Sequence, residues 1–204
     1  QRSMRDHFRG STGRGAIIGL VDSGIDFLHP DFIEDDRGRS RIAWLWDQTR
    51  LGRVPGQLGT SVFSYGDECT RTELTDATCA SRDTDGHGPD VAGSAAGDGS
   101  GARVGTSTYA YAGVAPGAEL IVVKTDLSFT GIVDAVDYIF RRATELGRPA
   151  VVNLSLGSQL GPHDGNAASS LMIDALAGPG RIIVASAGND GVNNADLGEP
   201  VVFP

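Results

Sequence analysis

Four short, nearly continuous apolar runs constrain the fold of this chain most tightly. They lie at residues 16–21 (Ala-Ile-Ile-Gly-Leu-Val), 120–123, 151–154 and 182–185. A strand that is apolar on both sides needs cover on both faces, as in a parallel sheet flanked by helices. The runs therefore predict buried strands of such a sheet. A fifth run at residues 42–46 (Ile-Ala-Trp-Leu-Trp) predicts a shorter, peripheral strand.

Helical patterns alternate with these strands. Apolar residues recur at helical spacing between Thr130, a start signal, and Gly147, a stop signal. Residues 167–177 predict a second helix, and the small residues of 91–96 predict a third that begins just after His87. The alternation predicts a doubly wound α/β domain with a mostly parallel sheet and helices on both faces.

Length and composition fit a single domain. The 204 residues are 40% hydrophobic and 21% charged, which is typical of a globular protein. Residues 47–86 are polar and turn-rich, so we expect a long surface excursion there. The net charge of −9 argues against nucleic acid or an anionic membrane as a partner. No apolar run approaches the roughly 18 residues that suggest a membrane span.

Polar side chains of catalytic types stand in glycine-flanked turns beside three of the apolar runs or helices. Asp22 follows the first strand, His87 lies between two glycines at a helix start, and Asn189 follows the last strand. Parallel strands present such residues at one edge of the sheet, so we expect the three to lie close together. Taken singly, each has an ordinary structural reading, since Asp and Asn are common turn formers and a lone His is usually structural or exposed.

In this order, the segments resemble the motifs of the subtilisin-like serine proteases, the subtilase or peptidase S8 family. Residues 19–32 (GLVDSGIDFLHPDF) resemble the aspartate motif, and residues 85–93 resemble the histidine motif. Residues 113–118 resemble the turn into the next strand, 153–157 the substrate-binding strand and 187–189 the oxyanion segment. The resemblance implies a subtilisin-like fold and peptide hydrolysis by a Ser-His-Asp mechanism.

A finer resemblance is carried by residues 46–49 (Trp-Asp-Gln-Thr) and 161–165. These segments are similar to those of the bacterial branch that contains the clostridial germination proteases.

The resemblance also implies roles for individual residues. Asp22 would hold the imidazole of His87 in the right tautomer, His87 would act as the base, and Asn189 would donate to the oxyanion. The implied substrate-binding residues are Ser128, Phe129, Thr130, Ser155, Leu156, Gly157, Ala187 and Gly188. The first three would flank the extended substrate as an antiparallel partner, and the others would form the backbone walls of the pocket before the scissile bond.

No cofactor or metal site is expected. The usual calcium-loop pattern of the family is not evident in residues 97–111, and the acidic clusters at 34–36 and 83–85 are typical of solvated loops. Residues 97–102 (GDGSGA) fit a dinucleotide-binding fingerprint, but they follow a helix-like segment instead of a strand, which disfavours that alternative.

Two departures from the family pattern bear on activity. Pro89 and Asp90 stand where the family usually has Thr and His, and Asp90 either raises the pKa of the imidazole or acts as a helix-start carboxylate. The serine motif is absent, because no serine lies in a Gly-x-Ser-x-Gly elbow. We therefore expect residues 1–204 to be the N-terminal and central part of a subtilase-like peptidase domain, incomplete at its C-terminus and inactive alone. The alternative is a catalytically inactive homologue that acts as a binding or regulatory module.

The expected partners are protein or peptide substrates and the C-terminal remainder of the same domain. The two cysteines, Cys69 and Cys79, form either a disulfide of an exported protein or two free thiols. An extracellular or cell-envelope location is the expectation that follows from the family.

Overall fold

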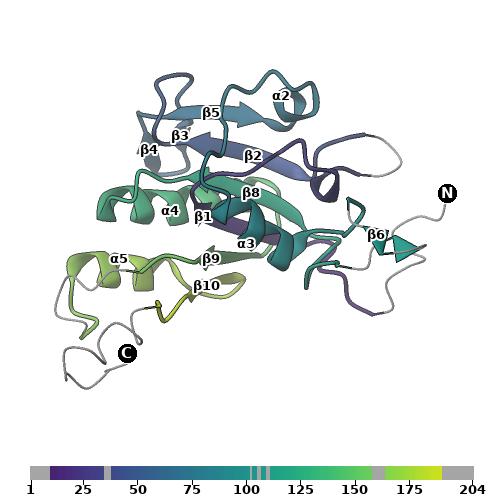
Figure 1. Cartoon of the computed structure of the whole chain (residues 1–204). Coiled ribbons are helices and arrows are strands. Elements are labelled where there is room, and N and C mark those ends of the chain that lie inside the picture. The colour runs from purple at the N-terminus through teal and green to yellow at the C-terminus, as the bar shows by residue number, and fades with distance from the viewer. Residues whose placement is uncertain are drawn as a thin grey trace, which may run out of the picture.

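A six-stranded sheet forms the centre of the molecule. The computed structural model describes residues 10–34, 38–101, 103–104, 107–108, 111–157 and 164–189. The strand order is β10-β9-β1-β8-β2-β5, and in Figure 1 the strands follow it from β10 at the bottom to β5 at the top. The strands are β1 (Ile17–Asp22), β2 (Ile42–Asp47), β5 (Asp67–Thr70), β8 (Glu119–Lys124), β9 (Ala150–Leu154) and β10 (Arg181–Ala185).

Most of the sheet is parallel, which confirms the predicted fold class. β1 lies between β8 and β9, with Ile17 opposite Glu119 on one side and Ala150 on the other. β10 and β2 extend the sheet in parallel, and β5 closes it with an antiparallel pairing to β2. All four apolar runs are strands, and the helices cover both faces of β1 and β8. β10 lacks such cover in the described part of the chain, where most of its residues are exposed.

Helices cover both faces of the sheet. α3 (His87–Ala96) packs on one face, and α4 (Phe129–Glu145) packs on the other, while α5 (Ala168–Leu176) lies beside α4. The alternation of side chains along β1 shows the division, since Val21 belongs to the cluster of α4 and Leu20 to the cluster of α3.

Small residues bring the helices close to the sheet. A Cβ at Gly19 of β1 would lie 2.6 Å from Cγ2 of Ile139 in α4, so only glycine fits there. α3 buries Gly88, Ala92 and Ala96, which recur every four residues and form one narrow face.

Two expectations for the N-terminal half are wrong. β2 is not a short peripheral strand, because it has six residues and lies between β8 and β5, with Trp46 fully buried. Residues 47–86 are more than a surface excursion, since they bury Leu58, Phe63 and Leu74. They contain β3 (Gly56–Leu58), β4 (Ser61–Phe63), β5 and α2 (Arg71–Thr75). Their apolar residues are too few and too scattered to show a period, and they are buried by contact with α4 and β2.

The remaining short elements lie elsewhere in the chain. They are the 3₁₀ helix η1 (Pro30–Phe32) and the strands β6 (Arg103–Val104) and β7 (Ser107–Thr108).

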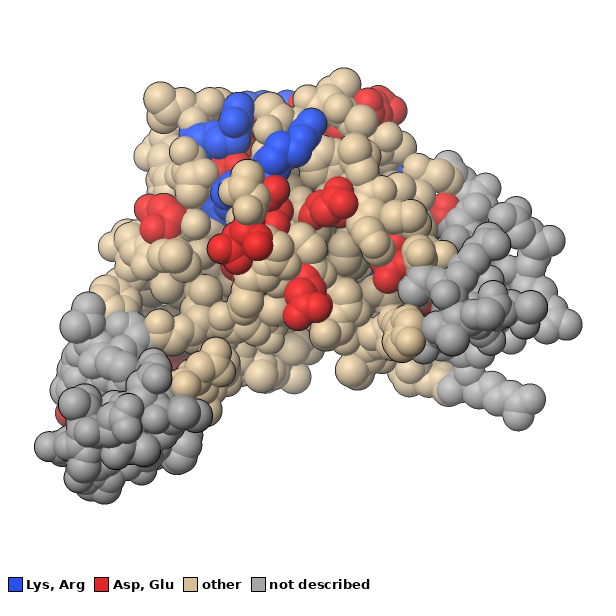
Figure 2. Space-filling view, viewed as in Figure 1, with Lys and Arg blue, Asp and Glu red and all other residues tan. Residues whose placement is uncertain are grey.

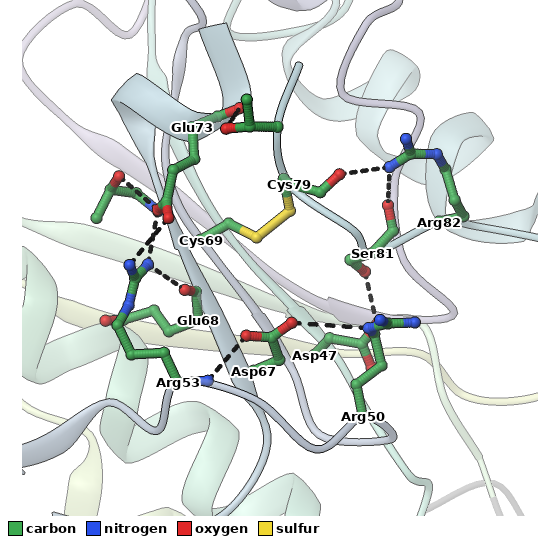
Figure 3. Close-up of a disulfide and its surroundings, with 12 residues drawn as sticks. Asp47, Arg50, Arg53, Asp67, Glu68, Cys69, Glu73, Cys79, Ser81 and Arg82 are labelled. Carbon is green, nitrogen blue, oxygen red and sulfur yellow. Dashed lines mark hydrogen bonds and ion pairs between the residues drawn. A yellow bond between two sulfur atoms is a disulfide. The ribbon is translucent and has the colours of Figure 1, made fainter. Parts of the chain in front are cut away.

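A disulfide joins the end of β5 to the chain that follows α2. Cys69 and Cys79 are bonded and buried, which resolves the two readings of the cysteines in favour of the bridge (Figure 3). Between them, Glu73 accepts from the backbone N–H of Thr70 at 2.8 Å and thereby caps α2. Hydrogen bonds from the Arg53 guanidinium lower the pKa of the Glu73 carboxyl to about 2.

Charged side chains are distributed unevenly over one face. In Figure 2, Lys and Arg side chains gather near the top, over the region of β2, β3 and β5, while Asp and Glu side chains lie mainly below them. Arg142 joins α4 to the sheet. Its Nη2 lies 2.5 Å from Oε1 of the buried Glu68 in β5, and its guanidinium carbon lies 4.9 Å from the ring centroid of Trp44 in β2. The hydroxyl of Tyr138 also donates to Glu68, at 2.6 Å.

The opposite end of the sheet is exposed within the described part of the chain. No residue of α5 is buried, and Leu171 and Met172 are each more than half exposed. Ile182 and Val184 of the neighbouring β10 are also at least half exposed. Among the described helices, none has the length and apolarity needed to cross a membrane.

Candidate active site

Asp22 and His87 lie in contact at the carboxyl edge of the central sheet. Asp22 is the last residue of β1 and is 1% exposed, whereas His87 begins α3 and keeps half of its side chain exposed. Alternation along β1 puts Asp22 on the same face as Leu20, the face that α3 covers. Nδ1 of His87 and Oδ1 of Asp22 are 2.7 Å apart. The expected contact between these two side chains is therefore present.

The turn after β1 and the first turn of α3 fit together through glycine. A Cβ at Gly88 would lie 2.0 Å from the backbone oxygen of Gly24, so a larger residue would push the helix away. Ser23 adds two hydrogen bonds, because its Oγ donates to Asp83 at 2.8 Å and accepts from the N–H of Gly88 at 2.9 Å. These contacts fix the start of the helix, and with it His87, against the end of β1.

Negative charge surrounds the imidazole of His87. The hydrogen bond to Asp22 is the largest cause that raises the pKa of His87 above its ordinary value, and the charges of Asp22, Asp85 and Asp90 act in the same direction. Burial opposes them with an effect smaller than that of Asp22 but larger than that of Asp85 or Asp90, and the pKa remains raised. Asp90 occupies the first turn of α3, so it fulfils both of the roles considered for it. The site is therefore built to stabilise an imidazolium.

The carboxyl ends of β9 and β10 form a second part of the same edge. The N–H of Ser186 donates to the backbone oxygen of Leu154, and its Oγ donates to the backbone oxygen of Leu156, both at 3.0 Å. Beyond them, a Cβ at Gly157 would lie 3.6 Å from Cα of Gly188. The two predicted backbone walls, residues 155–157 and 187–188, therefore lie side by side.

Asn189 is the last residue of this region that the structure describes. It is exposed and follows Gly188, whose φ of 82° lies in the left-handed region. Because β10 is parallel to β9 and β9 to β1, Asn189 lies beyond the same edge of the sheet as Asp22. Its role as an oxyanion donor stays a prediction.

A cavity of about 1080 Å³ lies between α4, α5 and the end of β9. Of the predicted substrate-binding residues, Phe129, Thr130, Ser155, Leu156 and Gly157 line it. Its other lining residues include Leu127, Ile132, Val133, Asp134, Met172 and Ile173, which the sequence motifs did not single out. Most of them are apolar residues of α4 and α5 and carry no sequence signal that separates them from ordinary helix residues.

The expectation for Ser128, Phe129 and Thr130 needs correction. Ser128 caps α4 by accepting from the N–H of Gly131 at 2.9 Å, and the two residues after it are helical. A helical turn does not present the alternating N–H and C=O groups that pair with an extended chain. These residues therefore do not offer an antiparallel strand, although two of them line the cavity.

Two buried polar residues at the end of β2 were also missed as parts of this region. Asp47 is fully buried and accepts from the hydroxyl of Ser81 at 2.6 Å, which holds the segment that leads to His87 (Figure 3). Gln48, which follows it, contacts the loop before α4. Within the described residues, no group of three or more His, Cys, Asp or Glu side chains is arranged to hold a metal ion.

Comparison with known proteins gives consistent matches. The model of the subtilase family matches residues 13–204. A subtilisin of Bacillus sp. (strain TA39) is 31% identical over 199 residues, which cover 93% of this chain and 37% of that protein. The minor extracellular protease Vpr of Bacillus subtilis (strain 168) is 30% identical over 192 residues, which cover 94% of this chain and 20% of that protein.

A solved structure agrees in fold. The CspB protease of Clostridium perfringens superposes with a TM-score of 0.71 at 25% identity, over 89% of this chain and 38% of that one. The chain thus spans less than half the length of each of these relatives.

Proposed function

This chain belongs to the subtilase family, and we propose from that premise that it supplies the aspartate and histidine of a serine endopeptidase. The substrates would be proteins or peptides. The observation that carries the proposal is the 2.7 Å contact between Nδ1 of His87 and Oδ1 of Asp22 at the carboxyl edge of the sheet. In this proposal the 204 residues form one part of a peptidase domain, and the nucleophilic serine lies outside them.

The Asp22–His87 pair would act as orienter and base. Asp22 accepts the Nδ1–H of His87, which leaves Nε2 to take the proton of the serine hydroxyl as the serine oxygen bonds to the carbonyl carbon. His87 then gives that proton to the amine nitrogen as the peptide C–N bond breaks, and water releases the acyl group by the same steps. The carboxylate that raises the pKa of His87 also stabilises the imidazolium between these transfers.

The adjacent edge would bind the substrate. The side-chain amide of Asn189 would donate to the carbonyl oxygen when it becomes negative. The walls at residues 155–157 and 187–188 would hold the substrate residue before the scissile bond. Supporting this, the two walls lie side by side, and residues 155–157 open into the cavity.

An extracellular or cell-envelope location is part of the proposal. A buried disulfide is typical of proteins from oxidising compartments. The similarity to the minor extracellular protease Vpr points in the same direction.

The test compares the full-length protein that carries this sequence with two histidine variants. His87→Ala should abolish hydrolysis of an unstructured protein substrate and labelling by a serine-directed fluorophosphonate. His29→Ala is the matched control, because His29 is a half-exposed histidine in a different turn, and it should leave both readouts unchanged. The isolated 204-residue chain should show neither activity, since the members of a triad act as a unit.

Two results would contradict the proposal. Hydrolysis by the isolated chain that disappears in His87→Ala would reveal a nucleophile within these residues. A correctly folded full-length protein that neither hydrolyses the substrate nor reacts with the fluorophosphonate would favour the inactive binding homologue. Pro89 and Asp90 would then be the first residues to replace with the Thr and His that the family usually has.

A further inference from the structure

The side chain of Gln48 bridges three segments that meet beside the cavity. It follows β2 directly and is 7% exposed. Its Nε2 donates to the backbone oxygen of Gly131 at 2.8 Å and to the hydroxyl of Tyr65 at 3.2 Å. Its Oε1 accepts from the backbone N–H of Asp126 at 3.3 Å. One carboxamide therefore holds both sides of the loop that leads into α4.

Between these two anchors the backbone takes an unfavourable conformation. Leu127 has a φ of 62°, in the left-handed region that a leucine side chain rarely adopts. Its N–H donates to Oγ1 of Thr125 at 3.1 Å, and the next N–H, of Ser128, donates to Oδ1 of Asp126 at 2.9 Å. Such a conformation persists only where surrounding contacts determine it.

The first turn of α4 is shaped to admit the bridge. A Cβ at Gly131 would lie 2.2 Å from Oδ1 of Asp126 and 3.0 Å from Oε1 of Gln48. Only glycine therefore allows the loop and the carboxamide to approach the helix this closely. Ser128 therefore lies between Leu127, with its left-handed backbone, and Gly131, whose missing Cβ leaves room for the contact.

The strained residue faces the cavity of the proposed enzyme. Leu127 is 65% exposed and lines the cavity together with Phe129 and Thr130. Residues 155–157, the proposed wall for the residue before the scissile bond, line the same cavity. A substrate seated there would extend its preceding residues toward Leu127.

We propose that Gln48 is a positioning residue, which fixes the wall at residues 127–130 and thereby the affinity for substrate residues that precede the one before the scissile bond. The inference rests on the proposed function. Gln48 touches neither the substrate nor Asp22 or His87. It acts through the loop, so its loss should weaken the binding of long substrates without slowing the chemistry at the triad.

The experiment measures two substrates with the full-length protein. The first is a tetrapeptide p-nitroanilide with phenylalanine before the scissile bond and leucine at its amino end, and the second is N-acetylphenylalanine methyl ester. Gln48→Leu should raise KM for the tetrapeptide about tenfold, equivalent to about 1.4 kcal/mol, with kcat nearly unchanged. The ester should be hydrolysed as before, because it does not reach Leu127.

Matched variants separate positioning from folding. Gln57→Leu removes an exposed glutamine of β3 that makes one exposed hydrogen bond, and it should leave KM and kcat unchanged for both substrates. Tyr65→Phe removes only one of the partners of Gln48 and should give a smaller rise in KM. Leu127→Gly relieves the strain, so Gln48→Leu should have little further effect in that background. Thermal unfolding of each variant shows whether it is folded.

Each outcome decides the inference. An unchanged KM for the tetrapeptide, or an equal loss of activity on both substrates, would overturn it. If the wild type hydrolyses neither substrate, the proposed function has failed, and calorimetry with the tetrapeptide acid decides the inference instead. Binding that Gln48→Leu weakens and Gln57→Leu preserves would support it, whereas equal binding by both variants, or no binding by the wild type, would overturn it.

Discussion

Opening the Cys69–Cys79 disulfide should destabilise the folded protein by about 2.7 kcal/mol at 25 °C. The bond closes a loop with a sequence separation of 10. In the chain-entropy relation, a loop of this size lowers the entropy of the unfolded chain by about 9 cal/mol/K, which gives that free energy. Because the effect lies mainly in the unfolded chain, the described fold should persist after reduction.

The assay is urea unfolding of the full-length protein in a His87→Ala background, which removes self-digestion. With a slope of about 2 kcal/mol/M, reduction by dithiothreitol should lower the midpoint by about 1.3 M. A Cys69→Ala/Cys79→Ala variant is the control, because dithiothreitol should not change its midpoint.

The size of the change decides between entropy and strain. A shift of less than about 0.3 M would mean that the bond contributes almost nothing, and the loop-closure reasoning would then be wrong. An increase in stability on reduction would show that the folded protein is strained by the bond. Loss of the native fold on reduction would show that the bond holds the segment before His87 in place by direct constraint.

Three further predictions concern the Asp22–His87 pair. Gly88→Ala should destabilise the protein by about 1–3 kcal/mol in urea unfolding, because the new Cβ would lie 2.0 Å from the backbone oxygen of Gly24. Gly93→Ala, with open space at its Cβ, should stabilise it by about 0.5–1 kcal/mol, and equal effects of the two variants would contradict the packing argument. kcat/KM should rise with pH as His87 loses its proton, at a pKa above the ordinary value of 6.5. Asp85→Asn should lower that pKa and move the rise to lower pH, because it removes a charge that favours the imidazolium, and a shift to higher pH would refute the reasoning. Asp22→Asn should lower kcat about 10⁴-fold in a folded protein, and a loss below tenfold would remove Asp22 from the mechanism.

The strands and helices with a clear hydrophobic pattern could be predicted from the sequence. The run at residues 16–21 and the helical spacing from Ile132 to Leu146 correspond to β1 and α4, because double-sided burial and one-sided burial leave different patterns. The Asp22–His87 contact was also predictable, since it depends on two motifs at element ends.

The parts that the sequence did not predict depend on contacts between distant segments. Leu58 and Phe63 lie on short strands with one buried apolar residue each, so no periodic pattern marks them. They are buried through packing against α4 and against Trp46 of β2. The role of Gln48 is hidden for the same reason, because its partners Tyr65 and Gly131 lie 17 and 83 positions away. Side chains that act across such separations leave no local signal.

The pairing of β1 determines when Asp22 and His87 can be brought together during synthesis of the chain. Ile17 must wait for Glu119 and Ala150 before its strand has neighbours on either side. At a ribosomal rate of about 5–20 residues per second, the gap of about 100 residues to Glu119 takes about 5–20 s. Throughout that interval Asp22 belongs to an unpaired segment, and His87 has no fixed acceptor. Until Glu119 has been synthesised, the nascent chain therefore carries Asp22 and His87 without the strand pairing that brings them together.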